Sequence, residues 1–192
     1  MPALSSALVP SAIPTVGDPT RLRLPDLLRI TDLNAEDVLS GRFDHLIPAG
    51  GIPPDERWFT RLHSDGELDV WLISWVPGEA TELHDHSGSL GALTILSGAL
   101  RETRWAGDQL RRRRLTAGDQ AAFPLGWVHD VTWAPADARS NEESAESAAA
   151  PTPTLSVHAY SPPLTAMSYY EVTERNTLLR TRTELTDAPE GR

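Results

Sequence analysis

From residue 58 onward the chain is built of short runs of β-forming residues, each closed by a turn signal. Residues 68–75 are rich in leucine, valine, isoleucine and tryptophan and end at Pro77 and Gly78. Further runs of this kind cover residues 90–96, 99–105, 110–115, 120–123, 128–133 and 155–160. β-Branched and aromatic residues favour strands, whereas glycine and proline favour turns. Strands this short, repeating about every ten residues, predict a β-dominated sandwich or barrel.

The segment before the strands has helical signals. Residues 22–30 mix apolar and charged residues, and Asn34 is followed by acidic residues in the manner of a helix N-cap and first turn. Gly41 then provides a stop signal. We therefore expect two short N-terminal helices before Pro48.

The length of 192 residues and the hydrophobic share of 40% fit a single domain with a substantial core. We expect a flexible arm over residues 1–21, a helical lead-in over 22–50 and a barrel over 57–173. Residues 134–154 are rich in alanine, serine, glutamate and proline, which predicts a disordered insertion without a chemical role. The remaining tail, residues 174–192, is polar and is predicted to be a last strand or a frayed end.

Composition excludes several classes of function. The net charge of −10 argues against nucleic-acid binding, and the basic run over residues 111–114 is short enough to be a solvated strand face. Cysteine is absent, which excludes disulfides, thiolate metal sites and cysteine nucleophiles. Residues 1–17 lack the positive charge of a signal peptide, and no apolar run reaches the ~20 residues that span a bilayer. We expect a cytoplasmic protein without a membrane partner.

Three histidines form the sharpest chemical signal. His84 and His86 are two residues apart, so on a strand both side chains leave the same face, while Asp85 points to the other. His129, arriving from a second strand, can complete a triangular set of nitrogen ligands. Three neutral imidazoles leave other coordination positions of a metal open, which suits catalysis. His45 and His63 carry no such spacing and are interpreted as ordinary side chains.

Two segments resemble the two conserved motifs of the cupin family. The residues that stand at motif positions are Gly78, His84, His86 and Gly98 in the first segment, and Gly118, Pro124, Gly126 and His129 in the second. Gly91 stands where cupins usually have a glutamate, and Trp133 where they have an asparagine. The resemblance therefore implies a three-histidine site without a carboxylate. Such a site keeps the full metal charge and favours an anionic, chelating substrate such as a thiolate.

Residues 59–163 further resemble the cysteine dioxygenases, or thiol dioxygenases, within the cupins. The residues that carry this resemblance are Phe59-Thr60-Arg61, Trp75, Gly98-x-Leu100-x-Glu102-Thr103 and Ser156-Val157-His158-Ala159-Tyr160-Ser161-Pro162-Pro163. The resemblance implies a cupin β-barrel of the jelly-roll type and a monomer. It also implies a non-haem Fe(II) enzyme, one iron per chain, that oxidises L-cysteine with O2 to cysteine sulfinic acid.

The same resemblance implies roles for individual residues. The iron ligands are His84, His86 and His129. Arg61 binds the substrate carboxylate through a fork-shaped, charge-assisted pair. Tyr160 holds its hydroxyl near the substrate and the bound oxygen.

Ser156 and His158 occupy alternate strand positions with Tyr160, so all three share one face. They form a hydroxyl–imidazole–hydroxyl relay that orients Tyr160. In mammalian members a cysteine at the position of Gly91 forms a thioether with the tyrosine; glycine is common there in bacterial members, so Tyr160 here depends on the relay and on packing. The family resemblance, and not the imidazoles, indicates iron, because zinc, nickel and copper bind such ligands at least as tightly.

Alternatives stay open at this point. A dioxygenase of another small thiol, such as 3-mercaptopropionate, has the same chemistry, although members that prefer this acid tend to have glutamine in place of Arg61. A non-catalytic cupin that binds a metal or small ligand would have no need of the Ser156, His158 and Tyr160 set. A cupin isomerase or a zinc or manganese enzyme is disfavoured by the missing glutamate. The tryptophans at 75, 127 and 133 are interpreted as pocket wall or core.

Overall fold

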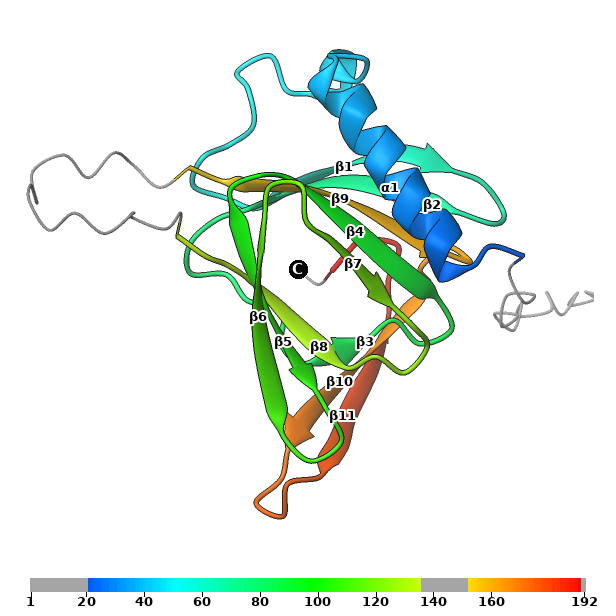
Figure 1. The fold of residues 1–192 in the computed structure, drawn as a ribbon, viewed down its shortest axis with the longest axis vertical. Helices are drawn as coiled ribbons and strands as arrows, with labels where there is room; N and C mark the ends of the chain where they lie inside the picture. Colours follow the sequence, from blue (N-terminus) through cyan, green and yellow to red (C-terminus); the bar gives the residue numbers. More distant parts are fainter. Residues whose placement is uncertain (1–20, 136–151, 191–192) are drawn as a thin grey trace, which may run out of the picture.

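The computed structural model describes residues 21–135 and 152–190, in which eleven strands form two antiparallel sheets that face each other (Figure 1). The first sheet has the order β1 (Trp58–Ser64), β2 (Asp69–Trp75), β9 (Thr154–Ser161), β4 (Leu90–Ser97) and β7 (Gln120–Phe123). The second has the order β11 (Leu178–Leu185), β10 (Ala166–Val172), β3 (His84–Asp85), β8 (His129–Trp133), β5 (Ala99–Trp105) and β6 (Leu110–Thr116). The predicted β-dominated jelly-roll barrel is confirmed.

A single α-helix, α1 (Leu24–Leu39), lies across the outer face of the first sheet and is followed by a 3-10 turn over Asp44–Leu46 (Figure 1). The expectation of two short helices is therefore wrong. Asn34 does not cap a helix; its Nδ2 donates a hydrogen bond to the Ile30 carbonyl, 2.9 Å away, within α1. The helix continues through this point because one side of it is buried against the sheet. The buried residues on that side are Leu27, Thr31 and Ala35.

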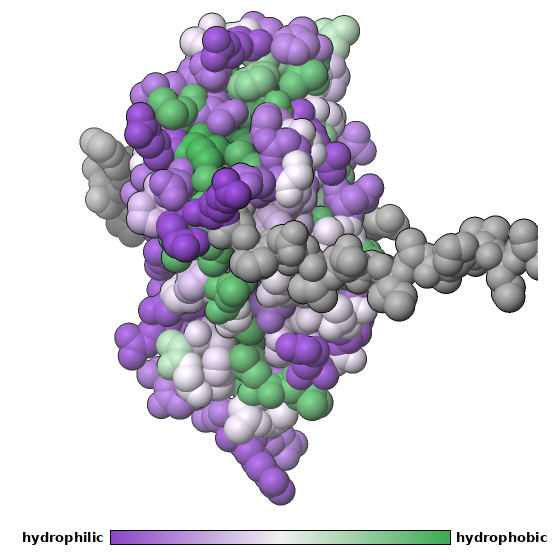
Figure 2. Space-filling model, turned by 90° about the vertical axis from the view of Figure 1, so that its right-hand side faces the viewer, coloured by the Kyte–Doolittle hydropathy of each residue, from purple (hydrophilic) through white to green (hydrophobic). Residues whose placement is uncertain are grey.

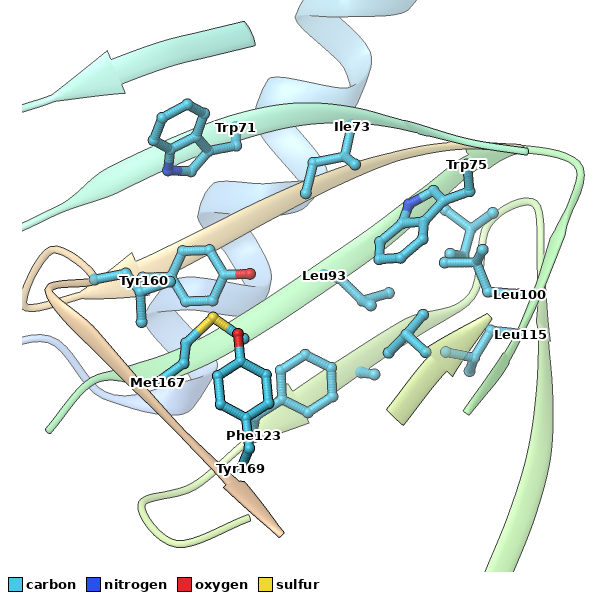
Figure 3. Close-up of a cluster of buried hydrophobic side chains, with 14 residues drawn as sticks. Trp71, Ile73, Trp75, Leu93, Leu100, Leu115, Phe123, Tyr160, Met167 and Tyr169 are labelled. Carbon is cyan, nitrogen blue, oxygen red and sulfur yellow. The ribbon is translucent and has the colours of Figure 1, made fainter. Parts of the chain in front are cut away.

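Strand β2 is buried on both of its faces, because its alternate residues belong to two different hydrophobic clusters. Val70 and Leu72 pack with the helix, whereas Trp71, Ile73 and Trp75 point into the space between the sheets. Figure 3 shows these three side chains directed toward the interior. The two-residue period of a strand thus divides one hydrophobic run between two cores.

Strand β9 is divided in the same way, and this positions the candidate relay. Val157 and Ala159 pack under α1. Ser156, His158 and Tyr160 alternate with them and therefore face the interior, where Figure 3 shows the Tyr160 hydroxyl. All three side chains are fully buried.

Gly98 closes the tight connection between β4 and β5. Its φ angle is +75°, and a Cβ at this position would lie 2.4 Å from Thr154 Oγ1. Thr154 cannot move aside, because its hydroxyl donates to the Ala99 carbonyl (2.8 Å) and accepts from the Ala99 amide (2.9 Å). Ala134 and Thr154, at the two edges of the predicted insertion, are thus buried parts of the fold; residues 136–151 lie outside the described residues.

Strand β11 lies in the segment predicted as a tail and pairs with β10. The residues after it turn back between the sheets, as the red segment in Figure 1 shows.

The arginines of residues 111–114 lie on β6, at the edge of the second sheet, and are mostly exposed. On the face shown in Figure 2, hydrophilic residues surround smaller groups of apolar ones. None of the described helices has the length and apolarity that crossing a bilayer requires.

Candidate metal centre

Three histidine side chains meet in the interior of the barrel. His84 on β3 stands directly opposite His129 on β8, and His86 follows β3. The ring centroids are 4.9 Å apart for His84 and His129, and 5.2 Å for each of the other two pairs. His84 and His129 are fully buried, and His86 is 4% exposed. The structure thus brings together the three residues that the spacing singled out.

The outer nitrogens of two rings are held by the protein. The Nδ1 of His84 lies 2.9 Å from the Glu82 carbonyl, and the Nδ1 of His129 lies 3.2 Å from Glu102 Oε1. These acceptors place the proton of a neutral imidazole on Nδ1 and leave the lone pair on Nε2. Both Nε2 atoms are buried without a hydrogen-bond partner. Inward-directed lone pairs of this kind are what a metal ion requires.

Glu102, which accepts the hydrogen bond from His129 Nδ1, was given no role by the sequence motifs. It is fully buried, and its carboxylate also accepts hydrogen bonds from Trp127 Nε1 (3.0 Å) and from the Arg113 guanidinium. Burial opposes its ionisation, but the His129, Trp127 and Arg113 partners lower the pKa of Glu102 to about 2. Trp127, interpreted from the sequence as wall or core, therefore also holds the carboxylate that orients His129.

A carboxylate that the motifs did not predict lies beside the three histidines. Glu190 is fully buried, with Oε1 3.0 Å from His86 Nε2 and Oε2 3.2 Å from His84 Nε2. Ligand atoms of the three histidines and Glu190 all lie within 4.8 Å of one another. The cupin motifs give no signal for Glu190, which is 104 residues from His86 in sequence.

A side chain at Gly91, the position of the glutamate in the cupin motif, would be crowded by two neighbouring rings. A Cβ on this glycine would lie 3.0 Å from Phe123 Cδ2 and 3.2 Å from His86 Nδ1. The Phe123 ring fills this side of the cluster, with its centroid 4.3 Å from that of His129. Trp133, at the usual asparagine position, packs against the core and donates from Nε1 to the Thr152 carbonyl at 3.2 Å.

The surroundings favour the metal-binding forms of His129 and Glu190, whereas at His84 burial opposes protonation but the Glu190 carboxylate outweighs it and raises the pKa. Burial lowers the pKa of His129 to about 4, so this ring is neutral at pH 7. Burial opposes ionisation of Glu190, but the neighbouring His84, His158 and His86 outweigh it and hold the pKa of Glu190 well below its ordinary value. Buried nitrogen and oxygen lone pairs without protein partners, next to an ionised carboxylate, fit a divalent cation.

The Ser156, His158 and Tyr160 set forms a continuous hydrogen-bond chain. His158 Nε2 lies 2.9 Å from Ser156 Oγ, and His158 Nδ1 lies 3.2 Å from the Tyr160 hydroxyl. The Trp75 indole extends the chain, donating from Nε1 to Ser156 Oγ at 2.8 Å. Tyr160 donates in turn to Glu190 Oε1 at 2.8 Å.

This chain has one direction that satisfies every group. Because the Trp75 indole donates only, Ser156 donates onward to His158 Nε2, and His158 donates from Nδ1 to Tyr160. Burial lowers the pKa of His158, which keeps the ring neutral in this arrangement. Burial, and then the Glu190 carboxylate, raise the pKa of Tyr160 well above its ordinary value, so its hydroxyl keeps the proton that it donates.

Arg61 lies at the rim of the interior and not among the histidines. It stands opposite Trp71 on β2, which stands opposite His158 on β9, so all three share the inner face. The Arg61 guanidinium is 4.2 Å from the centroid of the Trp71 ring and donates from Nη2 to the Asp187 carbonyl at 2.9 Å.

A second arginine, Arg57, is more deeply placed and carries no motif signal. Its guanidinium lies 4.5 Å from the centroid of the Trp75 ring, and its Nη2 donates to the Pro189 carbonyl at 3.2 Å. Burial lowers the pKa of Arg57, and the Glu190 carboxylate and the Tyr160 hydroxyl counteract this.

The Asp85 side chain points away from the histidine side chains, where it accepts hydrogen bonds from the Tyr170 hydroxyl and the Ser87 amide.

The solved structures to which this chain is similar include three with identities of 20% or less and TM-scores below 0.5. A conserved protein with a double-stranded β-helix domain from Klebsiella pneumoniae subsp. pneumoniae MGH 78578 has 20% identity and a TM-score of 0.43, covering 62% of this chain and 85% of that one. KdgF from Halomonas sp. has 16% identity and a TM-score of 0.42, covering 55% and 80%. The Cnp3 cupin domain of Schizosaccharomyces pombe has 10% identity and a TM-score of 0.44, covering 60% and 66%. No curated protein matches the chain in sequence.

The family comparison covers most of the barrel. The profile of the family described as cysteine dioxygenase type I matches residues 52–173, more than half of the chain. The matched region contains the three histidines and the Ser156–His158–Tyr160 chain, whereas Glu190 lies beyond it. The chain belongs to the cysteine dioxygenase type I family.

Proposed function

We propose that this protein is an Fe(II)-dependent dioxygenase that converts L-cysteine and O2 to cysteine sulfinic acid. Family membership supports a thiol dioxygenase of the cupin superfamily. The observation that carries the proposal is the buried cluster of three imidazoles directly beside the Tyr160 hydroxyl, whose direction is fixed by His158 and Ser156. A binding module without catalysis has no need of such a chain.

The reaction places both atoms of O2 on one sulfur. The thiol sulfur loses four electrons, and O2 gains four, so thiol and O2 give the sulfinic acid without a further reductant. Bound iron, held by His84, His86 and His129, would bring thiolate and O2 together and mediate the electron transfer. The barrel interior keeps water from this place, since the three rings are almost completely buried.

Tyr160 is the residue assigned to the reacting group. Its hydroxyl receives a hydrogen bond from His158 and donates its own proton to the acceptor in front of it, which in this structure is Glu190 Oε1. An anionic oxygen or thiolate at that place would receive the same hydrogen bond. A positioned, desolvated donor of this kind stabilises developing negative charge without reorganisation of solvent.

The substrate carboxylate is assigned to Arg61. This arginine faces the interior from the edge strand β1, in the same row as His158. The guanidinium presents several donors in one plane, which suits a carboxylate. Arg57 is a second cation close to the same place, and its stacking on Trp75 keeps it directed inward.

The test is oxygen uptake by the iron-loaded protein. Protein loaded anaerobically with Fe(II) would be mixed with L-cysteine or 3-mercaptopropionate, and the product identified by mass spectrometry. We expect a gain of two oxygen atoms on cysteine, loss of activity in His86→Ala, and a KM raised roughly tenfold or more in Arg61→Ala, because a hydrogen bond to a charged group contributes about 1.5–3 kcal/mol. His63→Ala is the matched control, since His63 is exposed and contacts Asp65.

The outcomes separate the alternatives. Faster turnover of 3-mercaptopropionate than of cysteine would keep the chemistry and overturn the assigned substrate. No oxygen uptake with any thiol by a protein that binds one iron per chain would overturn the enzyme assignment in favour of a ligand-binding cupin.

A further inference from the structure

Residues 186–190, the plug segment, fill the place that the proposed function assigns to the substrate. The Asp187 carbonyl accepts from Arg61, and the Pro189 carbonyl accepts from Arg57. The Glu190 carboxylate then contacts His84, His86 and the Tyr160 hydroxyl. One short segment therefore engages the arginines, the tyrosine and the metal-binding histidines together.

We propose that Glu190 is an internal, exchangeable ligand of the metal centre and that the plug segment is displaced when the thiol substrate binds. The proposal rests on the proposed function, because it takes the substrate to need Arg61, Tyr160 and the open metal positions. It also gives Glu190 a role outside the part of the chain that the family profile matches.

The burial of Glu190 requires a positive partner. An ionised carboxylate without solvent is costly unless charges and hydrogen bonds compensate it. Oε1 has two hydrogen-bond partners, His86 Nε2 and the Tyr160 hydroxyl, whereas Oε2 lies 3.2 Å from His84 Nε2 without a hydrogen bond to it or to any other described residue. The Nε2 atoms of His84 and His129 are likewise buried without a hydrogen bond to any described residue. These orphaned atoms belong to one cluster, so a cation held among them satisfies all of them.

The plug segment is held by side-chain and turn contacts and not by strand pairing. No described strand pairs with residues 186–190, although β11 immediately before them is paired along its length. The Thr186 amide donates to the Thr165 carbonyl, and the Thr186 hydroxyl bonds within the turn at Ala188. Segments without strand pairing open locally at low free-energy cost.

Space for the displaced segment adjoins it. A cleft of about 530 Å³ is lined by Thr186, Asp187 and Ala188 together with Tyr169 and Arg182. The segment forms one wall of this cleft, so open space adjoins it on that side. The Asp187 carbonyl occupies Arg61, which the proposed function assigns to the substrate carboxylate, and the Glu190 carboxylate occupies Tyr160 and the metal-binding histidines, which it assigns to the reacting groups.

The test compares the full chain with Glu190→Gln, which keeps the size of the side chain and removes its charge. Cysteine binding to the anaerobic Fe(II) protein would be measured by titration, and amide hydrogen exchange would be followed by mass spectrometry. If the plug is in place about nine-tenths of the time, the apparent Kd for cysteine falls about tenfold in the variant. Glu174→Gln, an exposed glutamate in the β10–β11 turn, is the control.

Two further readouts do not depend on turnover. Saturating anaerobic cysteine should accelerate amide exchange in residues 187–190 and leave the β10 peptide unchanged. Zn²⁺ competition without substrate should show weaker metal binding in Glu190→Gln than in the parent chain. Cysteine that binds with an unchanged or higher Kd in the variant, or without faster exchange in the plug segment, would overturn the proposal. Absence of cysteine binding in both proteins would instead refute the proposed function.

Discussion

Replacing Glu102 by glutamine tests how the fold orients His129. The buried carboxylate accepts from His129 Nδ1 at 3.2 Å, from Trp127 Nε1 at 3.0 Å and from Arg113. Although burial opposes it, these partners shift the pKa of Glu102 from an ordinary 4.5 to about 2. One pKa unit corresponds to about 1.4 kcal/mol, so the fold favours the ionised carboxylate by about 3 kcal/mol.

The pH dependence of this stabilisation has a definite sign. Because the pKa of Glu102 is depressed in the folded state, the stabilisation is present above the ordinary pKa of 4.5 and is lost as the pH falls through about 2. We expect Glu102→Gln to lower the free energy of unfolding by about 3 kcal/mol at pH 7 and by only about 1 kcal/mol at pH 3. The amide can donate as well as accept, so it no longer restricts the His129 proton to Nδ1, and metal affinity should fall about 10–100-fold.

The assay is urea unfolding of the metal-free protein at both pH values, followed by tryptophan fluorescence, with Zn²⁺ competition at pH 7. Glu171→Gln is the control, because Glu171 is exposed on β10. A stability difference that is the same at pH 7 and pH 3 would refute the role of the Glu102 charge. Unchanged Zn²⁺ affinity would refute its role in orienting the ligand.

Two further substitutions test the packing and the relay. Gly98→Ala should lower the free energy of unfolding by about 3 kcal/mol, since the added methyl meets a threonine hydroxyl of β9 at 2.4 Å. Gly107→Ala has a similarly positive φ angle with open space around it, so equal losses in urea unfolding would contradict the steric argument. Ser156→Ala should cost about 2–4 kcal/mol, because Trp75 Nε1 and His158 Nε2 both lose their buried partner. An unchanged Tm in Ser156→Ala would contradict the hydrogen-bond chain from Trp75 to Tyr160. Nitrogen NMR of the histidines would report whether His158 keeps its Nδ1 proton.

Local periodicity was enough to predict a β-dominated sandwich or barrel, whereas the motif resemblance was needed to bring His129 to His84 and His86. The alternation along residues 155–160 puts Ser156, His158 and Tyr160 on one face, and the structure places that face inward. The two-residue spacing of His84 and His86 works in the same way. Such predictions succeed because successive side chains of a strand point to opposite faces, so residues two apart share a face.

Local signals misled where packing outweighed them. The Asn34 region reads as a helix start, yet α1 runs through it from Leu24 to Leu39. Burial of the side that contains Leu27 and Ala35 against the sheet stabilises the continuous helix more than a cap at Asn34 stabilises two separate ones. The polar composition of residues 174–192 likewise gave no sign that Glu190 lies in the centre of the protein.

The sequence by itself determined the β-dominated fold class, the shared face of His84 and His86, and the shared face of the Ser156, His158 and Tyr160 set, because each follows from short-range spacing; the motif resemblance added His129. Only the tertiary structure decided what surrounds them. Glu102 and Glu190 reach the histidines from β5 and from beyond β11, 27 residues from His129 and 104 residues from His86. A buried carboxylate is positioned by the charges and hydrogen bonds that offset its lost hydration, and these partners come together only when the two sheets close.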